Sequence, residues 1–99
     1  MQTQTVSLCS EIDAWMTNVG VRNPGWYVGI TANIGERLFG DHNVSRTNDT
    51  WIYRRCLNAT EARELEASYH RAGCRGAGGG GDNDSVYIYA YVITSTTVE

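Results

Sequence analysis

The sequence predicts an α+β domain in which a small three-stranded antiparallel sheet is flanked by about three helices. Short segments rich in aromatic and β-branched residues at 26–31, 51–56 and 86–94 predict the strands. Apolar residues at helical spacing in 7–19, 34–41 and 59–72 predict the helices. A chain of 99 residues suits a single domain, so we expect one unit over 1–99.

The first expected helix spans residues 7–19 and has one apolar face. That face carries Leu8, Ile12, Trp15, Met16 and Val19. Ser7 is the expected N-cap, and Gly20 is expected to end the helix. The Asn-Pro-Gly stretch at 23–25 predicts a turn into the first strand.

Both later helices begin with a capping pattern. Asn33 is followed three residues later by Glu36, and Asn58 is followed by Glu61 in the same way. In the helix over 34–41, residues 34 and 38 should face the core. The helix after Asn58 should run to about residue 72 and bury its apolar stripe of Ala62, Leu65 and Tyr69.

The last strand, 86–94, alternates between two faces. Tyr87, Tyr89 and Tyr91 share one face, which could form a stacking platform for bases. Packing of these tyrosines under a helix is the favoured interpretation. The glycine-rich stretch before the strand lacks the Gly-Lys-Ser/Thr ending of a P-loop, so we expect it to be a flexible tether.

Composition limits the possible partners. All eight basic residues are arginine, and the formal net charge is −3, which argues against broad nonspecific binding of DNA. A local basic site remains compatible with that charge. No apolar run approaches the ~20 residues that span a bilayer, and the N-terminus does not resemble a signal peptide. We therefore expect a cytoplasmic protein with no membrane contact.

The three cysteines are an odd number and widely spaced, so free thiols in a reducing compartment are expected. Cys56, His70 and Cys74 could in principle ligate zinc. No Cys-x-x-Cys pair supports such a site, so we do not expect one.

Arg37 and Glu66 are the residues most suited to chemistry. Helical side chains lean toward the helix N-terminus, so Arg37 should point back toward the strand of Tyr27, where the two side chains and the helix end could make a small anion site. Spacing alone favours a plainer interpretation, an exposed ion pair with Asp41. Glu66 should be half-buried at the edge of its apolar stripe, as a carboxylate ligand for Mg²⁺ or as a partner of His70.

The stretch YVGITANIGERLFGDH, residues 27–42, resembles the second half of the signature of the GIY-YIG nuclease superfamily. The matching positions are Tyr27, Val28, Gly29, Thr31, Asn33, Ile34, Arg37, Leu38 and His42. Downstream, the Ala-x-x-Leu-Glu pattern ending at Glu66, a loop carrying Asn83 and a last strand follow in the family's order. The resemblance covers residues 25–92.

The resemblance implies a metal-dependent endonuclease that hydrolyses DNA phosphodiester bonds. Arg37 would stabilise charge on the scissile phosphate, and Glu66 would hold a single Mg²⁺ or Mn²⁺ ion. Tyr27 would orient or deprotonate the attacking water. His42 would support the phosphate or Tyr27, and Asn83 would fix the loop beside the metal.

Arg54 and Arg55 point to opposite faces of their strand, so one of them could contact the DNA backbone. The family's first strand, with its Gly-Ile-Tyr motif, is absent, and TNVGVRNPG at 17–25 takes its place. The alternative is therefore a catalytically inactive domain that binds nucleic acid or a protein partner. In either case, a homodimer or a protein partner could supply specificity.

Overall fold

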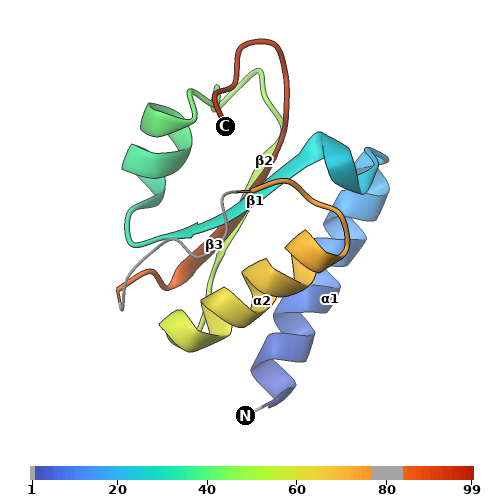
Figure 1. Cartoon of the computed structure of the whole chain (residues 1–99), viewed down its shortest axis with the longest axis vertical. Helices are drawn as coiled ribbons and strands as arrows, with labels where there is room; N and C mark the ends of the chain where they lie inside the picture. The colour runs from blue at the N-terminus through green and yellow to red at the C-terminus, as the bar shows by residue number, and fades with distance from the viewer. Residues whose placement is uncertain (1, 77–83) are drawn as a thin grey trace.

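The chain folds around a three-stranded antiparallel sheet with the strand order β1-β3-β2, which confirms the expected α+β class. A computed structural model describes residues 2–76 and 84–99 (Figure 1), and only the backbone for 2–10 and 23. Its helices are α1 (Gln2–Val19), the 3₁₀ turn η1 (Asn23–Gly25), the π-helix η2 (Gly35–Asp41) and α2 (Ala59–Arg71). Its strands are β1 (Trp26–Thr31), β2 (Trp51–Arg55) and β3 (Tyr87–Val92).

The predicted start of the first helix was wrong. Helix α1 begins at Gln2 rather than at residue 7, so Ser7 lies inside it and does not cap it. Residues 2–6 contain neither glycine nor proline, so no backbone constraint stops the helix before Ser7. The predicted end is confirmed, because Gly20 has a φ of 84° and its N–H bonds the carbonyl of Met16 at 3.1 Å.

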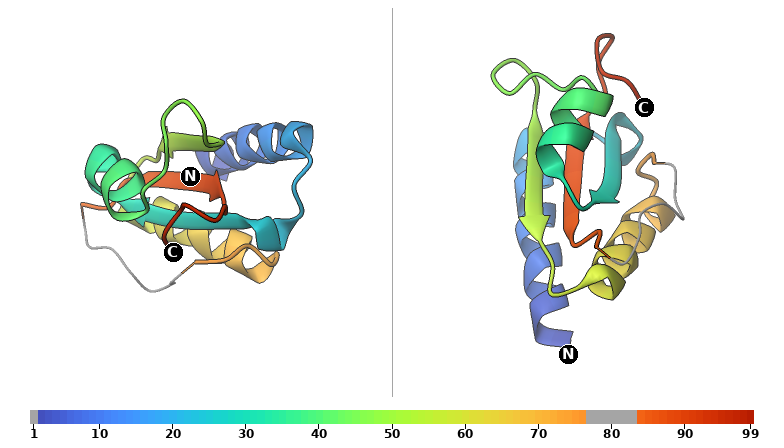
Figure 2. Two further views of the ribbon diagram at one scale, coloured as in Figure 1. Left: turned by 90° about the horizontal axis from the view of Figure 1, so that it is seen from above. Right: turned by 90° about the vertical axis from the view of Figure 1, so that its left-hand side faces the viewer.

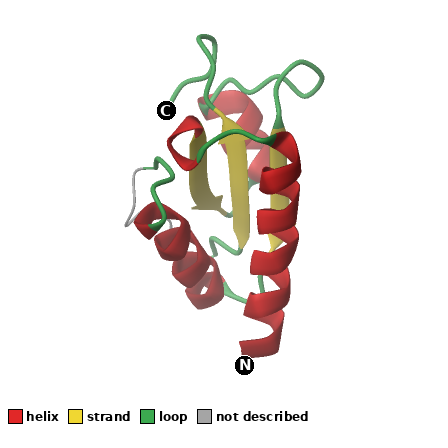
Figure 3. Cartoon of the chain, turned by 90° about the vertical axis from the view of Figure 1, so that its right-hand side faces the viewer, coloured by secondary structure: helices red, strands yellow, loops and turns green. Residues whose placement is uncertain are grey.

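The two faces of the sheet carry different layers. Helices α1 and α2 lie in front of the sheet in Figure 3, whereas η2 lies in front of it in the right panel of Figure 2, which is the opposite side. The layer under α1 and α2 is the larger core and includes Ile12, Leu65 and Ile88. The layer under η2 centres on Leu38 and three tyrosines, Tyr27, Tyr89 and Tyr91. We call this second side the tyrosine face.

The predicted cap at Asn58 is confirmed, whereas η2 has Ile34 as its N-cap and Asn33, one residue earlier, forms only the expected hydrogen bond with Glu36. The N–H of Glu36 donates to Asn33 Oδ1 at 3.1 Å, and the N–H of Glu61 donates to Asn58 Oδ1 at 2.9 Å. The helix after Asn33 is a π-helix, and its characteristic bond joins the His42 N–H to the Arg37 carbonyl at 3.0 Å. Leu38 is fully buried and anchors this short helix on the tyrosine face.

The outer edge of β1 is covered by the chain that follows α2. The Arg75 N–H donates to the Trp26 carbonyl at 2.8 Å, and the Val28 N–H donates to the Arg75 carbonyl at 2.9 Å. His70 Nε2 also lies 2.9 Å from the Val28 carbonyl, so α2 is tied to the same edge. The end of α2 is thereby fixed beside β1, where the site described below is assembled.

Two further expectations concern the cysteines and membrane-spanning helices. Cys56 and Cys74 are buried free thiols, and burial raises the pKa of Cys56 to about 11. Among the helices described, none combines the length and the apolar composition that crossing a bilayer would require.

Candidate functional site

A hydrogen-bonded chain runs across the tyrosine face through His42. His42 Nδ1 lies 2.6 Å from the Val98 carbonyl, and a carbonyl can only accept, so Nδ1 carries the ring proton. Nε2 is then an acceptor, and the Tyr89 hydroxyl donates to it at 2.7 Å. Burial also lowers the pKa of His42, which keeps the ring neutral. The direction of each bond in this chain is therefore fixed.

Arg37 joins the chain at its exposed end. Hydrogen bonding to the Tyr89 side chain is the largest cause of the raised pKa of Arg37. Since Tyr89 gives its proton to His42, its oxygen is available to accept from the guanidinium. Arg37 also forms the expected ion pair with Asp41, at 3.2 Å, in addition to its contact with Tyr89. The Arg37 side chain is 42% exposed, so it can reach a ligand.

Gly29 makes room for Tyr89. Gly29 and Tyr89 are partners across the β1–β3 ladder, and a Cβ on Gly29 would lie 2.5 Å from the Tyr89 hydroxyl. The tyrosine side chain therefore lies directly over this glycine. Burial raises the pKa of Tyr89 to about 12, so its phenol remains protonated near neutral pH and acts as a donor rather than as a base.

Tyr27 lies in the same layer but is almost fully covered. Its ring stacks on Tyr91 with centroids 5.2 Å apart and lies 4.6 Å from the His42 ring. Only 4% of Tyr27 is exposed. Tyr27 also contributes to the raised pKa of Arg37, which places the two side chains within electrostatic range.

Glu66 approaches the site from α2. The expected half-burial was wrong, because only 6% of Glu66 is exposed. Its helix is held against the edge of β1 by His70, one turn further on, and this packing covers the carboxylate. Desolvation raises the pKa of Glu66, and the nearby charges of His70 and Arg63 only partly oppose it. The Glu66 charge also helps to raise the pKa of Tyr89, so Arg37 and Glu66 both act on the same phenol.

The remaining predicted residues lie apart from this cluster or outside the description. Arg54 Nε donates to Glu11 Oε1 at 2.7 Å, so its head is held toward α1 on the opposite face. Arg55 is exposed on the tyrosine face. Asn83 lies outside the described residues. The sequence placed Tyr89 only among the three tyrosines on one face of the last strand, because its position over Gly29 depends on the strand register.

No protein-family model, curated protein or solved structure matches this chain. The functional conclusion therefore depends on the geometry of the residues themselves, and the resemblance to the GIY-YIG nucleases stays a prediction.

A magnesium site would have to be built on few protein ligands. Among residues 2–76 and 84–99, no three acidic, histidine or cysteine side chains gather in one place. Mg²⁺ commonly takes one or two carboxylates and completes its coordination with water and substrate phosphates. Glu66 fits that pattern, because a buried carboxylate without an ion pair in the described structure would be stabilised by a cation.

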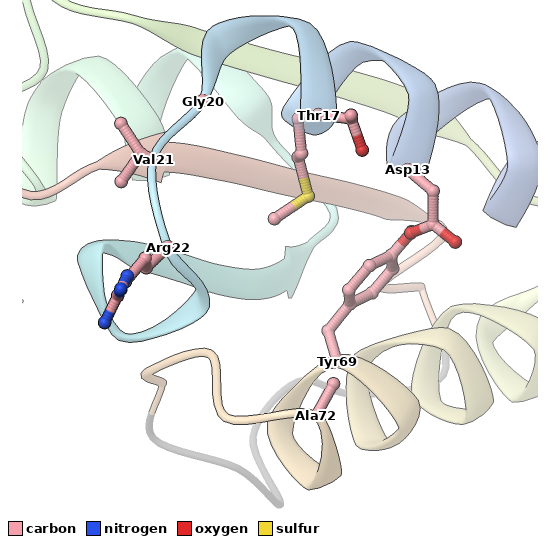
Figure 4. Close-up of a pocket in the computed structure, with 8 residues that line it drawn as sticks. Asp13, Thr17, Gly20, Val21, Arg22, Tyr69 and Ala72 are labelled. Carbon is pink, nitrogen blue, oxygen red and sulfur yellow. The ribbon is translucent and has the colours of Figure 1, made fainter.

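A separate pocket lies between α1, α2 and the turn that follows α1 (Figure 4). Tyr69 donates to Asp13 Oδ1 at 2.8 Å across one side, and Arg22 lies on the other. Met16 and Val21 form part of its apolar lining. It contains none of the residues predicted for catalysis.

Acid should weaken the fold through His42. The unfolded histidine binds a proton near pH 6.5, whereas the buried ring has a lowered pKa, so stability should fall as pH drops below about 6.5. The slope contributed by this ring is at most about 1.4 kcal/mol per pH unit. The positive charge of Arg37 also lowers the pKa of His42, whereas the negative charges of Asp41 and Glu99 raise it.

The His42→Gln variant isolates this contribution, because glutamine does not titrate. Glu66 has a raised pKa and should stabilise the fold as it is protonated, but this effect is common to both proteins and cancels in their difference. Urea unfolding at pH 5.5 and 7.5 should show a smaller loss in the variant. Equal losses in the two proteins would contradict the assignment.

Proposed function

We propose that this chain is a divalent-metal-dependent endonuclease that hydrolyses DNA phosphodiester bonds in a reducing cytoplasm. One observation carries the proposal: the Arg37 guanidinium hydrogen-bonds the Tyr89 side chain, and the buried Glu66 carboxylate is near enough to contribute weakly to the raised pKa of that phenol. Hydrolysis of a phosphodiester is favoured by a carboxylate that can bind a cation and by a fixed guanidinium that can stabilise charge on the phosphate.

Arg37 would stabilise the charge that develops on the phosphate. Its guanidinium is held by a buried chain of donors and acceptors that ends at the Val98 carbonyl, so little reorganisation is needed when the substrate arrives. Tyr89 and His42 act as positioning residues in this arrangement. His42 is 2% exposed, so it holds the tyrosine rather than touching the phosphate itself.

Glu66 would hold the divalent ion together with the substrate phosphate. The ion, when bound, would supply a Lewis acid that stabilises the leaving oxygen. The cost of keeping the Glu66 charge buried would then be offset by the cation. Tyr27 keeps its proposed role of orienting the attacking water from beside His42.

A catalytically inactive binding domain is the second candidate. The burial of Tyr27 and His42 favours it, because the groups proposed to handle the water are covered by neighbouring rings. Such a domain would still present Arg37 to a nucleic acid or to an acidic protein partner. A homodimer or another protein could supply specificity in either case.

Replacing Glu66 by glutamine separates these candidates. Wild-type protein should nick supercoiled plasmid with Mg²⁺ or Mn²⁺, and Glu66→Gln should lower that rate by about 10²-fold or more. The variant should also be more stable at pH 7 and melt at a higher temperature, because desolvation raises the pKa of Glu66 and makes its buried charge unfavourable.

The matched control is Glu64→Gln, which removes the same charge from an exposed position of α2. It should change neither the nicking rate nor the melting temperature. Absence of nicking by the wild type with both metals would refute the nuclease proposal. Retardation of DNA without nicking would support the binding domain instead.

A further inference from the structure

Part of the tyrosine face is open. Tyr89 and Tyr91 are buried beneath η2 and the C-terminal segment, but Tyr53 on β2 is 42% exposed. Trp51 and Tyr87 beside it are half-buried. The Trp51 and Tyr53 rings are nearly parallel, with centroids 6.3 Å apart, and Tyr87 meets Tyr53 at 6.2 Å. We call Trp51, Tyr53 and Tyr87 the open aromatic row.

Arginines lie at both ends of this row. At one end the Arg46 guanidinium lies 3.8 Å from the centre of the Phe39 ring, which packs edge-on against Trp51 at 4.9 Å. At the other end Arg55 is the register partner of Tyr87 and is exposed. Neither arginine forms an ion pair within the described part of the chain. The row is therefore an aromatic surface with a free positive charge at each end.

The row is continuous with the candidate site. Tyr53 and Tyr89 are partners across the β2–β3 ladder, and Tyr89 holds Arg37. A chain of nucleotides lying along the row would thus bring a phosphate toward Arg37. The open aromatic row and Arg37 therefore both adjoin Tyr89 on one face of the sheet.

We propose that the open aromatic row binds unpaired bases of single-stranded DNA, with Arg46 and Arg55 contacting the flanking phosphates. Aromatic rings gain by stacking on exposed base faces, which a duplex keeps covered by its own stacking. Two arginines on a chain of net charge −3 are also too few to hold a duplex through phosphates alone. If the protein is a nuclease, its substrate would carry a single-stranded segment at the cut, and this part of the inference rests on the proposed function. Binding of single-stranded DNA by the row does not depend on cleavage.

Binding can be measured without cleavage, in EDTA and with Glu66→Gln. Fluorescence anisotropy should show that a labelled oligo(dT) binds more tightly than a duplex and more tightly than an abasic oligonucleotide with the same phosphates. Tyr53→Ala should weaken oligo(dT) binding by about 5- to 150-fold, the range for loss of one stacked base. With two phosphates neutralised, log K should fall against log salt with a slope of about −1.4.

Trp51 provides a second readout. Bound oligo(dT) should quench the tryptophan fluorescence of the wild type, and Trp51→Phe should lose most of that quenching. The other two tryptophans lie on the opposite face, where Trp26 is fully buried and Trp15 packs partly buried against the same core. Val19→Ala removes a comparably exposed apolar side chain from the end of α1 and should bind like the wild type. Thermal melts should show that Tyr53→Ala stays folded, since its ring is partly in solvent.

The outcomes distinguish this inference from the nuclease proposal. Oligo(dT) binding that needs Tyr53, from a protein that cuts nothing, would support the row and refute the nuclease. Nicking that survives Tyr53→Ala, together with equal binding of abasic and base-bearing strands, would overturn the row and leave the nuclease standing. Failure of the wild type to bind oligo(dT) would also overturn it.

Discussion

Replacing Arg37 by alanine is expected to lower the rate of plasmid nicking by about 10²–10³-fold while leaving the domain folded. The loss corresponds to removing one fixed group that stabilises developing charge in the transition state. The fold should survive because the side chain is 42% exposed and its ion pair with Asp41 is a surface pair, which contributes about 0–1 kcal/mol at most. Circular dichroism and thermal melts check the fold, and a plasmid time course measures the rate.

Three control variants accompany Arg37→Ala. Arg37→Lys keeps the charge but not the planar fork, so it should recover only part of the rate. Asp41→Asn breaks the ion pair while leaving the guanidinium and its Tyr89 contact, so it should keep activity. Arg71→Ala removes one exposed positive charge from the end of α2 and should have little effect. Equal losses in Arg37→Ala and Arg71→Ala would mean that only net charge matters.

Local signals predicted most of the fold. The strand Trp26–Thr31, the cap at Asn58 and the hydrogen bond from Glu36 to Asn33 depend on neighbouring residues, so the sequence is enough to locate them. The start of α1 was missed because no local breaker marks it. The π-helix was missed for a different reason. Its bond to His42 belongs to a residue held by Val98, 56 positions away in the chain.

The site was less predictable than the fold because it depends on register and packing. The alternation of the last strand placed Tyr87, Tyr89 and Tyr91 on one face, yet their exposure differs with what covers each one. Tyr89 is opposite Gly29 only in the observed β1–β3 register. The burial of Glu66 likewise follows from the docking of α2 against β1, which helical periodicity cannot specify.

Replacing Gly29 by alanine should destabilise the domain and disable the site together. The added Cβ would lie 2.5 Å from the Tyr89 hydroxyl and 2.7 Å from the adjacent ring carbon. Tyr89 cannot yield freely, because it is 2% exposed and bonded to His42. Overpacking of this kind costs about 1–3 kcal/mol, or about 4–8 °C in melting temperature for each 1 kcal/mol. Movement of Tyr89 would also release Arg37, so nicking should fall.

A double-mutant cycle tests whether Tyr89 is the cause. Leucine at position 89 is shorter than tyrosine, so Gly29→Ala should cost far less in a Tyr89→Leu background, and the two effects should not add. Gly40→Ala is the matched control, because its Cβ would meet nothing nearer than the Gly35 carbonyl at 3.9 Å. That substitution should be neutral or slightly stabilising. If Gly29→Ala cost the same with leucine as with tyrosine at position 89, the close approach would not explain the glycine.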